Sequence, residues 1–492
     1  MTAGAGTVTA ADAGAGAREG SELGDSGAAR GVGLEAAGED TIAAIATAAG
    51  PGGVGIVRLS GPRAIAIAAA AVGLPEAALD RRVQVRWATD ARGERIDQVV
   101  AFAMRAPASF TGEDVAELQG HGGALSLGKL LEAVVGRGAR IAEPGEFTRR
   151  AVANGKLDLV RAEALLEVIH AGSERSWRLA RDNLGGRLGA GVAELEQRGL
   201  RLLAELEGWI DFPEEDLEAQ SLAWIEAELV ALHGSCAALC DGFRHGRAVS
   251  RGITAALVGP VNVGKSSLLN ALVGSERALV AAEPGTTRDW LETSAVWQGV
   301  AVTLVDTAGR RDTADPIERR GIALGEERVA AADVVVVVND GVAPWDRGER
   351  YGGRAVVVRS KADLACAAAA DADVEAADAG ASASRAGAAV LATSSATGQG
   401  LDELRRRILA VAGVADREGA EHAVVTTARQ HAMATAARDA AAAARALWRA
   451  RRPLELVAVE LRQAAQSLAQ LRGVEVGDRV LDEVFARFCI GK

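Results

Sequence analysis

Residues 253–272 read ITAALVGPVNVGKSSLLNAL, and this stretch decides the fold of the middle of the chain. A short apolar run predicts a buried strand, a loop bounded by glycines follows, and an apolar helical pattern comes next. The loop, residues 259–266, fits G-x-x-x-x-G-K-S, in which glycines let the backbone wrap phosphates and the lysine reaches the β and γ phosphates. The order of strand, loop and helix disfavours a chance glycine-rich turn and predicts a nucleoside triphosphatase.

Two motifs further along the chain supply parts that can sense a γ phosphate. Residues 286–289 read TTRD, where a threonine hydroxyl can complete the coordination shell of Mg²⁺. Residues 306–309 read DTAG after the apolar run 302–305, which places an acid near the metal and a glycine amide near the γ phosphate. Together the two motifs predict a nucleotide-dependent switch.

Two later motifs select the base. Residues 360–363 read SKAD after an apolar strand pattern, and Asp363 can accept hydrogen bonds from the N1 and N2 donors of guanine. Residues 394–396 can offer a backbone amide to the guanine carbonyl. The five elements in this order predict a GTPase domain over residues 251–411.

The motifs predict which residues contact the nucleotide. Ser266 and Thr287 are the predicted Mg²⁺ ligands. The predicted GTP-binding residues are Asn262, Val263, Gly264, Lys265, Ser266, Ser267, Thr286, Thr287, Asp306, Thr307, Ala308, Gly309, Ser360, Lys361, Asp363, Ser394, Ser395 and Ala396.

One motif departs from the usual pattern. GTPases have asparagine where this chain has Ser360, and that asparagine braces the phosphate-binding loop and contacts the base. Serine is shorter, and loss of one hydrogen bond costs about 1 kcal/mol, so we expect weaker GTP affinity with guanine specificity retained. A scaffold whose nucleotide binding has decayed is the alternative, which single-turnover hydrolysis would distinguish.

Composition and charge set the broad class. The chain has 492 residues, enough for about three domains. Hydrophobic residues make up 49%, and four scattered cysteines suggest neither a disulfide framework nor a zinc site. No apolar run reaches the roughly 20 residues of a membrane helix, so we expect a cytoplasmic protein. A net charge of -11 means that any RNA contact needs a local basic surface.

The flanking segments differ in pattern. Residues 1–38 are rich in Ala, Gly, Ser and acids, which predicts a disordered extension, because a transit peptide would be poor in acids. Residues 39–155 begin with β patterns, whereas residues 156–250 and 412–492 show helical spacing. The GTPase domain is therefore predicted to be inserted into a helical domain.

The flanks also carry recognisable motifs. These are GGVGIVR (52–58), SFTGEDV (109–115), ELQGHGG (117–123), PGEFT (144–148), NGKLDL (154–159), IDFPEED (210–216) and the terminal FCIGK (488–492). With them, residues 40–492 closely resemble the MnmE (TrmE) family of tRNA-modification GTPases.

The resemblance implies a multidomain α/β fold: an N-terminal α+β folate-binding and dimerisation domain, a helical domain from two segments, and the inserted Ras-like GTPase domain. It implies a homodimer that joins an FAD-dependent partner of the MnmG/GidA type in a heterotetramer or larger complex and modifies C5 of the wobble uridine of certain tRNAs. A 5-formyl- or 5,10-methylene-tetrahydrofolate would contact Arg58, Glu117, Lys156 and Lys492.

The resemblance also implies a catalytic device without an arginine finger. K⁺ held near Asn262, Ala281, Glu283 and Thr286 would stabilise the transition state between facing GTPase domains, and Ala281 joins the nucleotide contacts. Glu318 matches the glutamate that positions the attacking water. A ribosome-assembly GTPase that binds RNA directly is the alternative, but it would need an RNA-binding domain where residues 412–492 are helical.

Cys489 is the second candidate catalytic residue. The cations Arg487 and Lys492 lie close to it in sequence and favour a thiolate. A free cysteine is equally often a small buried apolar side chain, so a chemical and a structural role both stay open.

Overall fold

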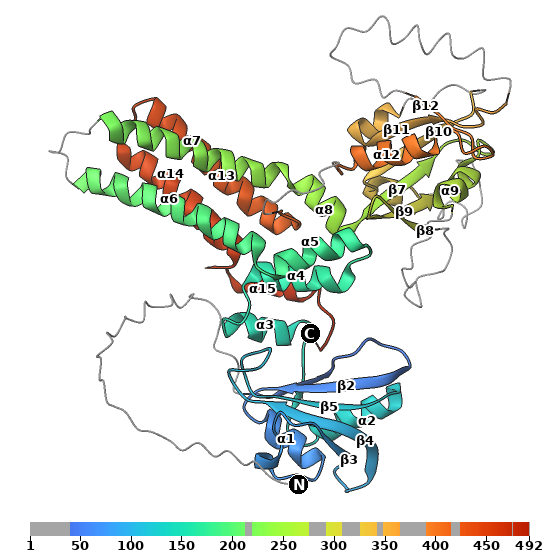
Figure 1. The fold of residues 1–492 in the computed structure, drawn as a ribbon, viewed down its shortest axis with the longest axis vertical. Helices are drawn as coiled ribbons and strands as arrows, with labels where there is room; N and C mark the ends of the chain where they lie inside the picture. Colours follow the sequence, from blue (N-terminus) through green and yellow to red (C-terminus); the bar gives the residue numbers. More distant parts are fainter. Residues whose placement is uncertain are drawn as a thin grey trace, which may run out of the picture. The chain divides into compact units, whose positions relative to one another are not determined.

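A computed structural model describes residues 40–211, 219–274, 292–307, 325–341, 348–364, 390–414, 424–474 and 476–491 (Figure 1). The expected fold class, a multidomain α/β protein, is confirmed. Each of two sheets has six strands, and a set of long helices forms a separate core.

The first sheet lies at the start of the described chain and confirms the expected β-rich beginning. Its neighbouring strands are antiparallel except for the parallel pair β1 and β6. In sheet order they are β3 (Gln84–Thr89), β4 (Arg95–Met104), β5 (Val115–Gly122), β2 (Gly52–Ser60), β1 (Ile42–Ile45) and β6 (Arg140–Ile141).

Helices α1 (Ala64–Ala71) and α2 (Ala124–Val135) pack against this sheet. In β4, buried and more exposed residues alternate, as expected when one face of a strand meets a core. Val57, Leu59 and Leu118 fill that core, while Arg58 and Glu117, their neighbours in sequence, point to the other face. The face opposite this core therefore carries the polar residues of interest, and it is covered in part, because Glu117 is buried and Arg58 lies over the Phe147 ring of α3.

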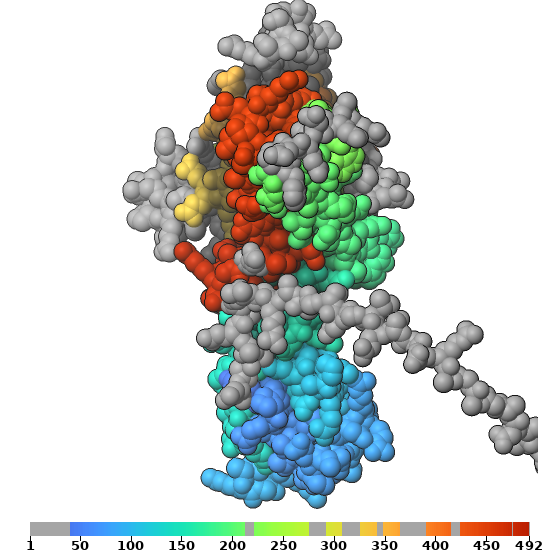
Figure 2. Space-filling model, turned by 90° about the vertical axis from the view of Figure 1, so that its left-hand side faces the viewer, coloured from blue at the N-terminus to red at the C-terminus, as the bar shows by residue number. Residues whose placement is uncertain are grey.

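The helical core is built from two segments far apart in sequence, as expected. Four helices supply it: α6 (Arg187–Asp211), α7 (Ala219–Asp241), α13 (Ala428–Arg449) and α14 (Leu454–Arg472). Figure 2 shows the red C-terminal helices lying directly beside the green helices of the first segment. The shorter helices are α3 (Glu146–Ala153), α4 (Leu159–His170), α5 (Glu174–Leu184), α8 (Phe243–Arg251) and α15 (Asp478–Phe485).

A buried ion pair joins the two segments. The Glu163 carboxylate of α4 accepts from Arg429 Nε at 2.9 Å and Nη2 at 2.8 Å, from Gln430 Nε2 at 2.7 Å and from Thr427 Oγ1 at 3.2 Å. Since a buried charge needs all its hydrogen bonds satisfied, loss of one partner here would cost about 3–5 kcal/mol.

One segment of the described chain, Ser221–Arg251, is long and apolar enough to cross a membrane by length and composition alone. Its Leu229, Leu232 and Cys236 are fully buried in the helical core. Burial raises the pKa of the Cys236 thiol to about 12, helped by the neighbouring Cys240. One face of this segment therefore packs into the helical core, where the buried Cys236 thiol is inert.

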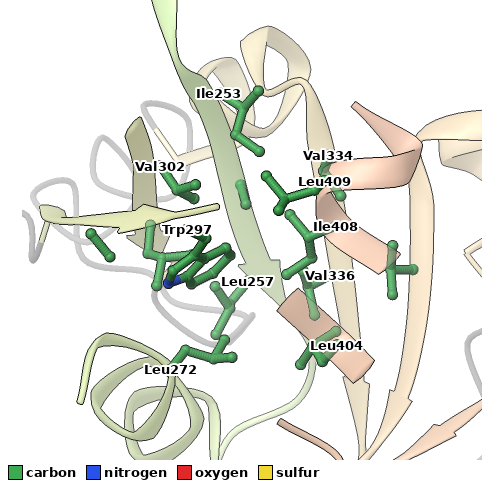
Figure 3. Close-up of a cluster of buried hydrophobic side chains, with 14 of the residues drawn as sticks. Ile253, Leu257, Leu272, Trp297, Val302, Val334, Val336, Leu404, Ile408 and Leu409 are labelled. Atoms are coloured by element: carbon green, nitrogen blue, oxygen red, sulfur yellow. The ribbon is translucent and has the colours of Figure 1, made fainter. Parts of the chain in front are cut away.

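The second sheet has the order β12-β11-β10-β7-β9-β8, parallel except for β8. Its strands are β7 (Ile253–Val258), β8 (Glu292–Trp297), β9 (Val300–Asp306), β10 (Val334–Asn339), β11 (Ala355–Arg359) and β12 (Leu391–Ala392), with helices α9 (Lys265–Val273) and α12 (Leu401–Val411). Figure 3 shows Trp297, Leu257 and Leu272 in the core of this sheet. In parallel sheets of this kind, ligands bind beyond the carboxyl ends of the strands.

Candidate functional site: a nucleotide cradle and a docked tail

The phosphate-binding loop lies between β7 and α9, where the sequence predicts it. Gly259 has φ 150°, and a Cβ there would collide with the carbonyl oxygen of Val338. Gly264 (φ 97°) caps α9, and Asn262 adopts φ 63°, a left-handed conformation that asparagine tolerates better than most residues. The loop thus aims the positive N-terminal end of α9 at the place where phosphates bind.

Lys265 is folded over this loop. Its Nζ donates to the carbonyl oxygens of Gly259 (3.1 Å) and Pro260 (2.7 Å), and only 7% of the residue is exposed. Burial lowers the pKa of this ammonium, and the nearby Asp306 carboxylate partly opposes that effect. An anionic phosphate would compensate for the burial, as the predicted role requires.

Ser266 and Asp306 meet at the carboxyl end of the sheet. Leu257 pairs with Asp306 across β7 and β9, and Ser266 Oγ donates to Asp306 Oδ2 at 2.5 Å. A hydroxyl and a carboxylate with phosphate oxygens nearby suit Mg²⁺, which prefers few protein ligands. Within the described residues there is no cluster of three His, Cys, Asp or Glu that could hold a metal, and Mg²⁺ binding at Ser266 stays a prediction.

The structure corrects the expectation for Ser360. Its Oγ donates to the carbonyl oxygen of Val263 in the phosphate-binding loop at 2.6 Å, so the loop keeps a brace. Its backbone N also donates to Asn339 O at 2.7 Å. The expected loss of this brace is wrong because the backbone brings the short serine close enough; the missing base contact stays a prediction.

The remaining base-side residues converge on the same edge. Lys361, at φ 58°, donates through Nζ to Asn262 O at 2.9 Å. Ser394 Oγ donates to Asp363 Oδ1 at 2.6 Å, which holds the carboxylate while leaving it further acceptor capacity. Ser395 and Ala396 form the turn that follows Ser394.

Asn339 is a site residue that the sequence analysis missed. Its carbonyl oxygen accepts from both N and Oγ of Ser360, and the residue is buried at the end of β10. The sequence does contain a signal for it: the all-valine run 334–338 ends in Asn-Asp, and its strand pairs with the strand that precedes Ser360.

Several predicted site residues lie outside the described residues. Their roles stay predictions: Ala281, Glu283, Thr286, Thr287, Ala308, Gly309, Glu318 and Lys492.

Removing the Ser360 hydroxyl should loosen the loop. We expect Ser360→Ala to weaken GTP binding about fivefold, because one hydrogen bond worth about 1 kcal/mol is lost, and Ser360→Asn to tighten it. Titration of a fluorescent GTP analogue measures both. Ser467→Ala is the matched control, since Ser467 Oγ also donates to a carbonyl oxygen, that of Gln463 at 2.9 Å, in the helical core. Equal GTP affinities of Ser360→Ala and the wild type would show that the hydrogen bond from Ser360 to Val263 does not contribute to GTP binding.

The predicted folate residues are only partly brought together. Arg58 and Glu117 face each other across β2 and β5, with Arg58 Nε donating to Glu117 Oε1 at 2.9 Å. Gln119 Nε2 donates to Glu117 Oε2 at 3.0 Å. Lys156 is exposed and donates to Pro107 O at 3.0 Å instead. A guanidinium beside a carboxylate fits a ligand with both an anionic tail and a ring of N–H donors.

The C-terminal tail docks on the N-terminal sheet of its own chain. Ile490 forms a β-bridge with Pro144, and Gly145 N donates to Cys489 O at 3.5 Å. Gly491 lies against Ile45, the neighbour of Ala44, which pairs with Arg58. The tail therefore ends beside the strand pair that carries Arg58.

Cys489 is exposed, which overturns the interpretation of it as a buried apolar residue. Arg487, the cation expected to act on the thiol, pairs with Glu483 at 3.0 Å. Cys489 is therefore exposed next to the place where the tail contacts Pro144 and Gly145.

The nucleotide cradle, the pair of Ser266 and Asp306 and the Asp363 carboxylate fit a P-loop GTPase whose sheet is inserted into a helical domain. Protein-family models match both flanks: "MnmE helical domain" over residues 159–489 and "GTP-binding protein TrmE N-terminus" over residues 41–156. The chain belongs to the MnmE (TrmE) family of tRNA modification GTPases, and it is a GTP hydrolase.

Full-length relatives agree. The tRNA modification GTPase MnmE of Symbiobacterium thermophilum is 42% identical over 467 residues, which cover 92% of this chain and 100% of the relative. That of Moorella thermoacetica is 40% identical over 469 residues, again 92% and 100%. Among solved structures, the G domain of the T. maritima FeoB iron transporter covers 32% of this chain and 98% of its own at 29% identity, with a TM-score of 0.25, too low for a conclusion about fold.

Proposed function

We propose that this tRNA-modifying GTPase acts with an FAD-dependent partner to add an aminomethyl or carboxymethylaminomethyl group at C5 of the wobble uridine. The observation that carries the proposal is the docked tail of a chain that also carries a GTP site. Ile490 pairs with Pro144 and Gly491 lies against Ile45, so the exposed Cys489 is close to the sheet that carries Arg58 and Glu117. The tetrahydrofolate derivative would supply the one-carbon unit. Arg58 and Glu117 would bind and orient it.

In the GTP site, each described residue has a separate task. Lys265 would neutralise the phosphates, the amides of the loop would hold them, and Ser266 with Asp306 would hold the Mg²⁺ shell that Thr287 would complete. Bound K⁺ would add positive charge at the transition state, with Asn262, Ala281, Glu283 and Thr286 as its contacts. Glu318 would orient the attacking water.

Assembly and location follow from the same proposal. We infer a cytoplasmic homodimer that makes no membrane contact and forms a heterotetramer or larger complex with the MnmG/GidA-type partner. Face-to-face approach of two GTPase domains would complete the K⁺ site.

The proposed mechanism is tested by comparing GTP hydrolysis in K⁺ and in Na⁺. We expect GTP hydrolysis to be about tenfold or more faster in K⁺ than in Na⁺, because a fixed positive charge in place of an arginine stabilises the transition state. Asn262→Ala should remove the difference. Since Asn262 has φ 63°, Asn262→Gly is the better-matched variant, because it keeps this backbone without strain. Steady-state phosphate release in the two salts measures the effect.

Equal wild-type rates in K⁺ and Na⁺ would contradict the cation mechanism. GTP affinity is measured in parallel, because Asn262 is also a predicted GTP-binding residue, and the rates in the two salts are compared at saturating GTP.

A further inference from the structure

Helix α5 presents an exposed stripe of one aromatic and two basic side chains. Trp177 is 42% exposed, and the side chains of Arg178 and Arg181 are 64% and 56% exposed. The guanidinium carbon of Arg181 lies 5.2 Å from the centroid of the Trp177 ring. A large exposed ring with a stacked guanidinium is a surface on which a nucleic acid base can stack.

The charge of this region is opposite to that of the chain. Residues 174–187 hold four arginines and two acids, a net charge of +2, whereas the whole chain carries -11. Arg178 pairs with Glu174, and Arg181 and Arg187 share Asp182 at 2.8 Å and 3.2 Å. Exposed ion pairs contribute only about 0–1 kcal/mol, so these arginines can exchange carboxylates for phosphates at little cost.

The opposite face of α5 is held firmly. Ser176, Ala180 and Asn183 are buried, and Asn183 Nδ2 donates to Val424 O at 3.3 Å. Because its backbone and inner face are packed, the helix offers Trp177 and the arginines from a rigid support.

The same helix touches the GTPase sheet. Leu179 packs against the core of that sheet, and Arg175 lies against Gly299, one residue before β9. β9 ends at Asp306, which accepts from Ser266 in the nucleotide site. A ligand on the outer face of α5 would therefore be separated by this helix alone from the sheet whose strand β9 carries Asp306.

We propose that the exposed stripe of α5, Trp177 with Arg178, Arg181 and the neighbouring Arg187, is a contact surface for tRNA, on which Trp177 stacks against an unpaired base and the arginines bind phosphates. The proposal rests on the proposed function and adds where the RNA is held. Every residue of α5 is described, and its exposed residues are Glu174, Trp177, Arg178 and Arg181. No aliphatic side chain within α5 is exposed, and this feature together with the net positive charge of residues 174–187 favours RNA over a protein partner with an apolar interface core.

The test measures tRNA binding by the full chain, with its FAD-dependent partner present, by filter binding over a series of KCl concentrations. Trp177→Ala should weaken tRNA binding about tenfold, because stacking contributes about 1–3 kcal/mol per base. The double change Arg178→Ala and Arg181→Ala should lower the slope of log affinity against log salt by about 1.5, because each phosphate that is no longer neutralised lowers it by about 0.7–0.9. Basal GTP hydrolysis should be unchanged in both.

Two matched controls lie in the helical bundle. Trp224 is 43% exposed, and the side chain of Arg462 is 62% exposed and pairs with Glu207. Trp224→Ala and Arg462→Ala should bind tRNA like the wild type. Equal tRNA affinity of Trp177→Ala and Trp224→Ala would overturn the proposal. It would also be overturned if Trp177→Ala no longer bound the FAD-dependent partner but still bound tRNA like the wild type, because the stripe would then be a protein interface. Absence of tRNA binding by the wild-type complex would instead refute the proposed function, before any variant is compared.

Discussion

Asp363→Ala is expected to reduce the preference for GTP over ATP by at least about 100-fold. Guanine presents two donors at this edge, N1–H and the amino group on C2, whereas adenine has an acceptor at N1 and only a hydrogen on C2. A carboxylate matches both donors, and each charge-assisted hydrogen bond contributes about 1.5–3 kcal/mol. The structure favours this role because Ser394 Oγ holds Asp363 Oδ1 at 2.6 Å, which fixes the orientation of the carboxylate.

The measurement is competition of GTP and ATP for one labelled nucleotide. GTP affinity should fall while ATP affinity stays nearly constant. Asp402→Ala is the matched control, since Asp402 is an exposed acid of the same domain that pairs with Arg405 at 2.7 Å. Asp363→Asn should prefer xanthine to guanine nucleotides, because its amide can donate to the C2 carbonyl of xanthine. An unchanged ratio of GTP to ATP affinity in Asp363→Ala would show that another group reads the base.

Sequence alone predicted the nucleotide cradle well, for a physical reason. The phosphate-binding loop is one contiguous segment between a strand and a helix, so its geometry follows from local patterns. Ser266, Asp306 and Asp363 each end or follow a strand of a parallel sheet, which gathers them at one edge. Contacts of this kind need only the strand order to be right.

The prediction that Ser360 cannot brace the phosphate-binding loop was wrong because the brace depends on the position of the backbone. A comparison of side-chain lengths shows that serine is shorter than asparagine, but not how near the loop comes. With Ser360 N held by Asn339 O and the next residue, Lys361, at φ 58°, the hydroxyl reaches Val263 O. The packing of the sheet sets this position of the backbone, and it cannot be inferred from the sequence motif.

Contacts between distant segments were also beyond sequence reasoning. Glu163 and Arg429 are 266 residues apart in the sequence. Helical spacing predicts whether a residue lies on a buried or an exposed face of its helix, but not which distant residue it contacts. The exposure of Cys489 was undecided because a free cysteine is often buried, and only the structure of the docked tail shows that this one is exposed. Long-range geometry fixed both.

Gly491→Ala is expected to abolish wobble-uridine modification while GTP hydrolysis stays within about twofold of the wild type. Gly491 has φ 98°, which an L side chain rarely adopts, and a Cβ would collide with the carbonyl oxygen of Ile45. The tail would leave the N-terminal sheet, and strain of about 1–3 kcal/mol is enough to shift a terminal segment of few contacts. The predicted GTP-binding residues do not include the tail, so the GTPase should keep its rate.

The control is Gly477→Ala, in the same C-terminal segment. Gly477 has φ -70°, and a Cβ there would meet nothing within 4 Å, so both activities should persist. The measurement is paired: multiple-turnover phosphate release by the purified variant, and nucleoside analysis of tRNA from cells whose only copy is that variant. Loss of both activities in Gly491→Ala would point to general unfolding and contradict a local role of the tail.

Cys489→Ser then separates the chemistry of the tail from its docking. The substitution keeps the size of the side chain and leaves Gly491 and the β-bridge of Ile490 to Pro144 in place, so the tail should still dock. If the exposed thiol takes part in the reaction, modification should fall about 100-fold or more, as when a nucleophile is removed, with GTP hydrolysis preserved. Normal modification in Cys489→Ser, with loss in Gly491→Ala, would leave docking as the sole role of the tail, because the thiol would then be dispensable at a site that still requires the tail in place.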